Sequence, residues 1–173
     1  MPPVPGVSAI VVMGVSGAGK STVGRLVAAR LDCPFRDADS FHPPANVAKM
    51  AGGQPLTDED RWPWLRAIAA WIAEHRVAGT TCVVTCSALK RAYRDIVTDH
   101  QCADVRLVYL KGEFDLIAAR LAARKGHFMP PALLKSQFDA LEPPTADERA
   151  IAVPIDATPE EIAARAVVQI ATA

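Results

Sequence analysis

Residues 14–21 read GVSGAGKS and match the phosphate-binding pattern G-x-x-x-x-G-K-[ST] at every fixed position. The surroundings also fit, because a largely apolar run over residues 8–13 precedes the pattern and apolar residues at helical spacing follow it. A plain glycine-rich turn is the alternative. Chance matches to the fixed positions should occur in well under about one chain in a hundred, given an average glycine usage of about 7%. The stretch therefore predicts a nucleoside triphosphate site between a strand and a helix.

The chemistry of ATP binding assigns a role to each part of this stretch. Glycines let successive backbone N–H groups point at one phosphate, and the helix that follows adds the positive end of its dipole. Lys20 is expected to reach the β- and γ-phosphates of ATP, and the Ser21 hydroxyl is expected to ligate Mg²⁺. The other nucleotide-binding residues expected in the stretch are Gly14, Ser16, Gly17, Ala18, Gly19 and Thr22.

Strand-like and helix-like patterns alternate along the rest of the chain. Strands are predicted at residues 7–13, 34–37, 81–85, 105–110 and 150–155, and helices at residues 21–31, 43–51, 63–76, 89–97, 114–123, 130–141 and 159–170. Thr57 is a candidate N-cap, but Pro63 lacks the N–H that a regular turn uses, so regular helix is expected only from about Pro63. The alternation predicts an α/β fold with a parallel sheet and helices on both faces.

Length predicts a single domain, and the balance of charges does not indicate a nucleic-acid or membrane partner. Length alone, at 173 residues, predicts one domain. Lys plus Arg and Asp plus Glu both number 19, so no excess of positive charge indicates nucleic acid or an anionic membrane. Residues 1–6 are expected to form a disordered tail before a domain over residues 7–173, and no apolar run approaches the ~20 residues of a membrane span. We expect a cytoplasmic protein.

The four cysteines, Cys33, Cys82, Cys86 and Cys102, are expected to be free thiols. If Cys82 and Cys86 lie on one strand, a rise of about 3.3 Å per residue puts them ~13 Å apart. Two sulfurs at ~2.3 Å from one zinc ion cannot be that far apart. This pair is therefore predicted to lie in the core.

Asp37 and Asp39 follow the second predicted strand. In extended backbone, residues i and i+2 point to the same side, and ligands of open α/β sheets bind at the carboxyl ends of the strands. One carboxylate would orient the water shell of Mg²⁺, and the other would accept the proton or hydrogen bond of an attacking hydroxyl. Asp37 is expected at the metal and Asp39 is favoured as the base, although the pattern leaves their order open. A pair of solvated turn residues is the alternative.

Arg120 and Arg124 lie four residues apart near the end of a predicted helix, so they share one face. Because Lys125 and Gly126 follow, we predict a mobile lid over about residues 124–131. On closing, it would bring positive charge onto the transferring phosphoryl group and exclude water. Cations that merely favour a helix C-terminus are the alternative, and the phosphate-binding stretch favours the lid.

Four further side chains are candidates for binding a second substrate. Lys90 follows the third predicted strand, at the same edge of the sheet as the phosphate-binding stretch. His42, next to two prolines, could hydrogen-bond a substrate hydroxyl or serve only the structure, and the sequence leaves both open. Lys49 and Arg61 lie in the helical region between the second and third predicted strands.

Three motifs outside the phosphate-binding stretch are more selective than it is. They read DADSFHP at residues 37–43, CSALK at 86–90 and ARKGHFM at 123–129. With stretches at 13–22, 46–50, 55–65 and 109–112 they cover nearly the whole chain. In this order they resemble the P-loop gluconokinases of the shikimate-kinase-like and adenylate-kinase-like class. Ala38 is a minor departure, because the family often has glycine there.

The resemblance implies a P-loop NTPase three-layer α/β fold with a five-stranded parallel sheet. It also implies transfer of the γ-phosphoryl group of ATP to the 6-hydroxyl of D-gluconate. Arg61 would hold the gluconate carboxylate, the loop at Asp156 would border adenine, and His127 of the lid would join Asp39 at the substrate. A substrate-binding helical segment is expected at about residues 40–78. A homodimer would be in keeping with the family.

Two other functions stay open at this point. A P-loop kinase for another small hydroxy acid, such as shikimate, would carry a similar arginine for its carboxylate. A nucleotide-binding switch protein without kinase activity is the more distant alternative. The acid pair and the basic lid argue against a switch, because a switch needs no acceptor pocket.

Overall fold

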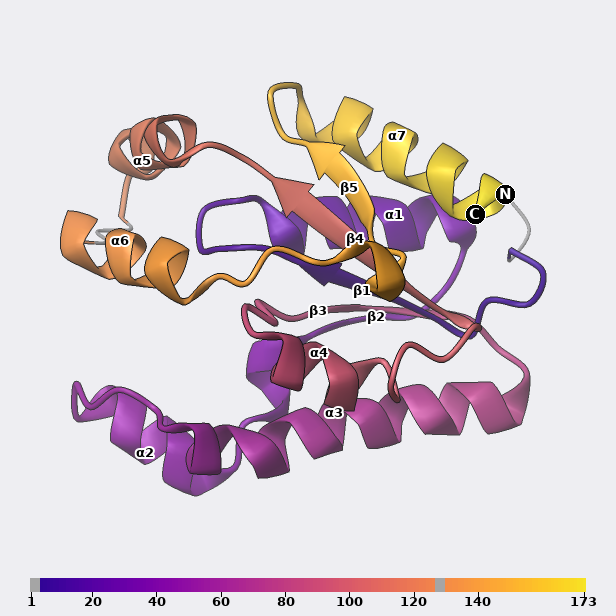
Figure 1. Cartoon of the computed structure of the whole chain (residues 1–173), viewed down its shortest axis with the longest axis horizontal. Helices are drawn as coiled ribbons and strands as arrows, with labels where there is room; N and C mark the ends of the chain where they lie inside the picture. The colour runs from indigo at the N-terminus through magenta and orange to yellow at the C-terminus, as the bar shows by residue number, and fades with distance from the viewer. Residues whose placement is uncertain (1–3, 127–129) are drawn as a thin grey trace.

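The computed structural model describes residues 4–126 and 130–173 as alternating strands and helices (Figure 1). In chain order, with η for a 3₁₀ helix, these are β1 (Ala9–Met13), α1 (Lys20–Leu31), β2 (Phe35–Asp37), η1 (Ala38–Phe41), α2 (Pro44–Ala51), α3 (Asp58–Ala78), β3 (Cys82–Thr85), α4 (Arg91–Val97), β4 (Val105–Lys111), α5 (Phe114–Ala123), α6 (Pro131–Ala140), η2 (Ala146–Glu148), β5 (Ile151–Pro154) and α7 (Pro159–Thr172). All five predicted strands are present, and α5 has the predicted bounds.

The strands form one parallel sheet in the order β2-β3-β1-β4-β5 (Figure 1). At its centre, Val11 of β1 pairs with Val84 of β3 on one side and with Leu107 of β4 on the other. Because the strands are parallel, the loops after β1, β2 and β3 meet at one edge of the sheet. The chain leaves β1 toward β2 and later crosses to β4, so the topological switch point lies beside β1, where such sheets bind ligands. The predicted α/β fold is confirmed.

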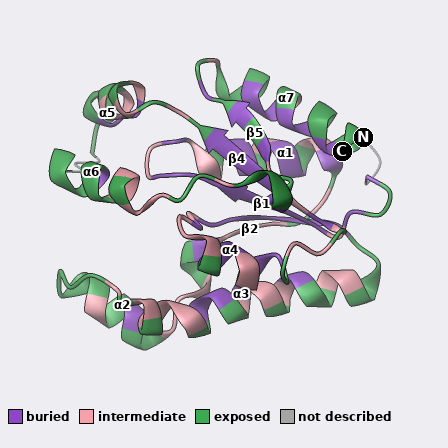
Figure 2. Cartoon of the chain, viewed as in Figure 1, coloured by how far each residue is buried: buried purple, intermediate pink, exposed green. Residues whose placement is uncertain are grey.

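Side chains of β1 alternate between two apolar cores, one on each face of the sheet. Ile10 and Val12 belong to the core that α1 and α7 close, whereas Val11 and Met13 belong to the core that α3 and α4 close. All four are fully buried, and Figure 2 shows the sheet buried between the helices. Helices on both faces explain why β1 has a continuous apolar sequence instead of an alternating one.

Helix α3 begins earlier than predicted. The Thr57 hydroxyl accepts a hydrogen bond from the Asp60 N–H at 3.2 Å, and the Asp60 carboxylate accepts one from the Thr57 N–H at 2.8 Å. This capping box starts the helix at Asp58, and Pro63 lies inside it. The expectation of an irregular first turn was wrong, because the cap satisfies two N–H groups while Pro63 costs a single hydrogen bond to the Glu59 carbonyl.

Replacing Thr57 by alanine is expected to lower the free energy of unfolding by about 1 kcal/mol, because the Asp60 N–H loses its acceptor. Urea denaturation followed by circular dichroism measures the change. The matched control is Thr172→Ala, since the Thr172 hydroxyl only bonds to carbonyls in the last turn of α7. Equal unfolding midpoints for Thr57→Ala and the parent would contradict this assignment.

The ends and the cysteines can also be compared with the sequence. The expected tail over residues 1–6 does not hold for Val4, which is 9% exposed and accepts a hydrogen bond from the Val7 N–H. Residues 1–3 lie outside the described residues. The cysteines are free thiols as predicted, with Cys82 and Cys86 buried. No helix in the described part of the chain is long and apolar enough to cross a membrane.

Candidate active site

The loop between β1 and α1 has the form of a phosphate cradle. Gly17 and Gly19 have φ angles of 82° and 92°, which residues other than glycine rarely adopt. A Cβ atom at Gly17 would lie 2.7 Å from Cγ of Leu121 on α5, so the loop is packed too closely for any larger residue. Helix α1 starts at Lys20 and directs its first N–H groups and positive dipole end into the loop. These features fit a bound phosphate chain.

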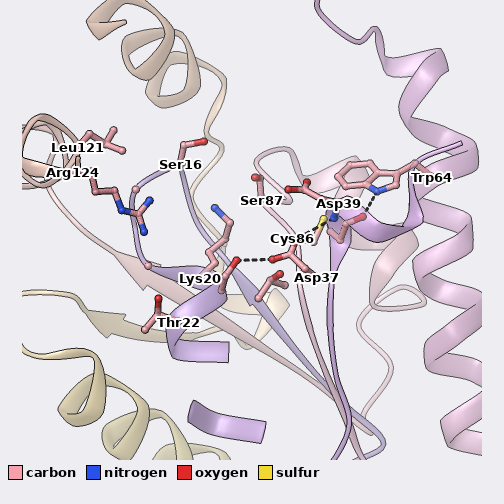
Figure 3. A pocket seen from close by; sticks show the side chains of 15 residues that line it. Ser16, Lys20, Thr22, Asp37, Asp39, Trp64, Cys86, Ser87, Leu121 and Arg124 are labelled. Carbon is pink, nitrogen blue, oxygen red and sulfur yellow. Dashed lines mark hydrogen bonds between the residues drawn. The ribbon is translucent and has the colours of Figure 1, made fainter. Parts of the chain in front are cut away.

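The cradle opens into a cavity of about 370 Å³ at the carboxyl edge of the sheet. It is lined by the cradle loop, by the first turn of α1, by the end of β2 and η1, by Trp64 of α3, by the loop after β3 and by the end of α5. Figure 3 shows Leu121 and Arg124 on one side, Asp39 and Trp64 on the other, and Lys20 between them. A cavity with cations and carboxylates on opposite walls can hold a phosphoryl donor against an acceptor.

Lys20 extends into this cavity from the first turn of α1 (Figure 3). Its Nζ donates a hydrogen bond to the Val15 carbonyl at 3.0 Å. Burial lowers the pKa of Lys20, while the charges of Asp37 and Asp39 act in the opposite direction. A half-buried ammonium group beside an N–H cradle is suited to the oxygens of a phosphate chain.

Asp37 and Asp39 both line the cavity, but for a different reason than predicted. Only Asp37 lies in β2, whereas Asp39 belongs to η1, so the two do not alternate along one extended strand. The Asp37 carboxylate caps η1 by accepting the Asp39 N–H at 3.1 Å and also accepts the Ser21 hydroxyl at 2.5 Å. Burial raises the pKa of Asp37, but these hydrogen bonds outweigh it and lower the pKa overall.

Ser21 and Asp37 together fit a Mg²⁺ site. Their oxygen atoms lie 2.5 Å apart at the wall of the cavity, next to the cradle. Mg²⁺ prefers hard oxygen ligands and takes few of them from the protein, because phosphates and waters supply the rest. The Ser21 hydroxyl and the Asp37 carboxylate could therefore supply the protein ligands of a Mg²⁺ ion beside the cradle.

Trp64 holds η1 in place. Its indole Nε1 donates a hydrogen bond to the Ala38 carbonyl at 2.7 Å, and its ring stacks on His42 with centroids 4.4 Å apart. Trp64 is 8% exposed, so this bond is shielded from water. Among the described residues, no protein group donates a hydrogen bond to the Asp39 carboxylate, which leaves its oxygens for a substrate.

A buried ion pair holds the loop after β3. Arg94 and Glu148 have side chains that are 1% exposed, and they are joined by hydrogen bonds of 2.5 and 2.9 Å. Arg94 also donates to the carbonyls of Ala88 and Leu89 at 3.0 and 3.1 Å. This loop brings Ser87 and Cys86 to the cavity, where burial raises the pKa of the Cys86 thiol to about 12.

The structure separates the two arginines that were expected to act together. Arg124 lines the main cavity and also a second cavity of about 310 Å³, whereas Arg120 lines only the second. Arg120 donates a hydrogen bond to the Ile155 carbonyl. The second cavity lies between the cradle and the start of α7, and Asp39 does not line it. Arg120 therefore lies at the second cavity and does not line the main one with Lys20 and Asp39.

Two of the expected nucleotide-binding residues also lie elsewhere. Gly14 lines neither cavity, and a Cβ atom there would lie 3.1 Å from the Leu110 carbonyl, so close packing explains this glycine. Asp156 does not line the second cavity, although its neighbour Ala157 does. The Asp156 carboxylate instead lies 4.0 Å from Arg165 of α7. The roles predicted for Gly14 and Asp156 in nucleotide binding stay predictions.

The expected substrate cations are paired with acids of α3. Arg61 donates to the Leu56 carbonyl at 2.6 Å and lies 3.8 Å from Asp58, which also binds Lys90 at 3.2 Å. Lys49 pairs with Asp60 at 2.5 Å. None of these three, nor His42, lines the main cavity.

The predicted lid is described only in part. Arg124 and Gly126 are described, with a φ angle of 83° at Gly126, whereas His127 and the rest of residues 127–129 lie outside the described residues. One contact near the lid was missed by sequence reasoning. Gln137 of α6 forms two hydrogen bonds with Ser16 of the cradle, and no spacing rule links residues so far apart in the chain.

Comparison with known proteins agrees with this geometry. The sequence profile of the shikimate kinase family matches residues 16–170. A probable gluconokinase of Mus musculus is 47% identical over 92% of this chain and 95% of its own, and a gluconokinase of Gluconobacter oxydans (strain 621H) is 46% identical over 88% and 85%. The crystal structure of a gluconokinase from Sinorhizobium meliloti 1021 superimposes with a TM-score of 0.86 at 44% identity, over 98% of this chain and 94% of that one. The chain therefore belongs to the shikimate kinase family of P-loop kinases and, within it, to the gluconokinases.

Proposed function

We infer that this chain is an ATP-dependent gluconokinase, which transfers the γ-phosphoryl group of ATP to the 6-hydroxyl of D-gluconate and releases 6-phospho-D-gluconate and ADP. One observation carries the inference. A carboxylate, Asp39, lies across a single cavity from Arg124 with Lys20 between them, in a chain of the gluconokinase family. A phosphoryl donor and an alcohol acceptor need this arrangement, because positioning and charge stabilisation supply most of the rate.

Five side chains of the cavity have roles in the proposed reaction. Lys20 binds the β- and γ-phosphate oxygens, and Arg124 neutralises charge that develops on the transferring group. Asp39 orients the 6-hydroxyl and accepts its proton. Ser21 and Asp37 would hold Mg²⁺, which supplies charge neutralisation between the phosphates when bound.

Two cations are candidates for binding the carboxylate of the acceptor. Arg61 and Lys90 both lie near Asp58, at 3.8 and 3.2 Å, so these cations already face one carboxylate. We propose that the gluconate carboxylate binds to them next to Asp58, since an arginine fork matches a carboxylate. Lys49, His42 and, in the lid, His127 are proposed to bind the hydroxyl groups.

The second cavity is proposed to hold the adenosine part of ATP. It combines Arg120 and Arg124 with the apolar side chains of Ala157, Pro159 and Ile162. A flat base needs apolar walls and a cation over one face, and this set supplies both. Asp156 is proposed to border the base. We further propose a cytoplasmic location. We also propose a homodimer, and size-exclusion chromatography with light scattering would test this oligomeric state.

A substrate panel tests the assignment. Formation of ADP is coupled to oxidation of NADH with gluconate, its epimers, shikimate or nucleoside monophosphates as acceptor. We expect kcat/KM for gluconate to exceed that for shikimate by at least about 10²-fold, because protein groups that pair with the hydroxyl groups of gluconate would be left without partners. A higher value for shikimate would favour the kinase of another hydroxy acid. Binding of ATP with no transfer to any acceptor would favour a switch protein.

A further inference from the structure

Gln137 of α6 is bound to the phosphate cradle at Ser16. The Ser16 N–H donates to Oε1 of Gln137 at 2.7 Å, and Nε2 of Gln137 donates to the Ser16 hydroxyl at 2.9 Å. Each half of the carboxamide is used once, as acceptor and as donor, so the side chain matches Ser16 in one orientation only. We refer to this pair of hydrogen bonds as the clasp.

The clasp lies at the acceptor end of the cradle. Ser16 lines the main cavity together with Asp39 and Arg124, and it does not line the second cavity. The second cavity contacts the cradle from Gly17 onward. The clasp is thus next to the space where the terminal phosphoryl group and the acceptor hydroxyl meet, and away from the nucleoside.

Helices on both sides of the predicted lid contact the cradle. Leu121 of α5, which precedes residues 124–131, fills the space where a Cβ atom of Gly17 would be. Helix α6 follows that segment and reaches Ser16 through Gln137. Phe114 of α5 packs edge-on against Phe138 of α6 with centroids 5.4 Å apart, so the two helices hold each other. The cradle, α5 and α6 therefore form one connected unit.

We propose that Gln137 is a positioning residue for phosphoryl transfer, acting through Ser16. By holding the N–H and hydroxyl of Ser16, it fixes the acceptor end of the cradle and ties the position of α6 to it. The proposal takes the identity of the acceptor from the proposed function. The effect on the bound ATP, by contrast, is inferred from the clasp alone. Loss of two neutral hydrogen bonds is expected to reduce the rate by roughly ten- to a hundredfold.

The first test compares two methionine variants on one helix. Gln137→Met removes both hydrogen bonds at nearly constant volume and helix propensity. Lys135→Met changes a 70% exposed side chain whose ion pair, among the described residues, is with Asp139. We expect Gln137→Met to lower kcat by about tenfold or more, with KM for both substrates and Kd for ADP changed by less than about threefold. Lys135→Met should match the parent. A kcat of Gln137→Met within about twofold of the parent would overturn the proposal.

A second variant separates positioning from support of the fold. In Gln137→Glu the carboxylate still accepts from the Ser16 N–H and hydroxyl, so the clasp and the thermal midpoint are expected to persist. Its negative charge would face the phosphate chain, and kcat should fall at least as far as in Gln137→Met. A Gln137→Glu protein that keeps the parental thermal midpoint and loses kcat would show that the contact serves the reaction and not only the fold. A loss of kcat that only follows a loss of thermal midpoint in both variants would refute the proposal.

Two readouts keep this test independent of the acceptor. Hydrogen exchange at the Ser16 amide, followed by NMR, should be slow in the parent and fast in Gln137→Met. Slow hydrolysis of Mg-ATP without acceptor should fall by the same factor as kcat. If the parent fails to phosphorylate gluconate, the proposed function is wrong. The clasp is then still judged by these two measurements, and an unchanged hydrolysis rate in Gln137→Met would reject it.

Discussion

Replacing Lys20 by alanine is expected to lower kcat by about 10³-fold or more, because a preorganised cation at the developing phosphoryl charge is lost. The fold should persist. Burial lowers the pKa of Lys20, so the native structure holds this ammonium group at a cost in free energy. Removing it is therefore expected to leave the free energy of unfolding unchanged or slightly raised, which is common for residues placed for function.

The measurement pairs steady-state kinetics with urea denaturation. The matched control is Lys111→Ala, since Lys111 is an exposed lysine at the end of β4 and lines neither cavity. Its kcat should equal that of the parent. Near-normal turnover by Lys20→Ala would remove the phosphate-binding assignment, and a large loss of stability would contradict the account of its burial.

Replacing Asp39 by asparagine is expected to lower kcat by about 10²- to 10⁴-fold, because the amide keeps the size of the carboxylate but cannot accept a proton. ATP binding should change by less than about threefold, since Asp39 faces Arg124 from the acceptor wall and does not line the nucleoside-side cavity. The backbone should also be retained, because the Asp39 N–H, and not its side chain, bonds to Asp37.

Single-turnover kinetics and equilibrium titration with ATP separate these two effects. Asp115→Asn serves as the control, because Asp115 is an exposed acid in the first turn of α5. Loss of ATP affinity with unchanged single-turnover rate would assign Asp39 to the nucleotide instead of the acceptor. A parental rate would leave Asp37 as the candidate base.

The parts of the fold that were predictable are those fixed by local chemistry. Continuous apolar runs marked the central strands β1 and β3, because both faces of the sheet are covered there. The cradle was found because its glycines, Lys20 and Ser21 are needed at fixed spacing. Helix α3 was predicted too short. The stabilisation from the capping box at Thr57 exceeds the cost of the hydrogen bond that Pro63 cannot form. Both effects are local, but a sequence pattern does not give the relative size of their free energies.

The arrangement of the site was less predictable, because it depends on contacts between distant segments. Asp39 reaches the cavity through a 3₁₀ turn that Trp64 fixes from a helix 26 positions later in the chain. Arg94 holds the loop of Ser87 only because Glu148 is buried beside it. The charges of Arg61 and Lys90 were visible in the sequence, but their shared partner Asp58 was not.

The two cavities share the wall formed by Gly17, Gly19, Thr22, Leu121 and Arg124. The two cavities are thus neighbours that open onto one cradle. Their walls differ chemically, because the second cavity is apolar near Ile162 and the main cavity is acidic near Asp39. A bisubstrate inhibitor, with adenosine and a sugar acid joined through a polyphosphate linker, could occupy both chambers at once. Its affinity would gain from the effective concentration of the second group. Selectivity against other P-loop kinases would come from the acidic chamber, because nucleotide-binding cradles are much alike.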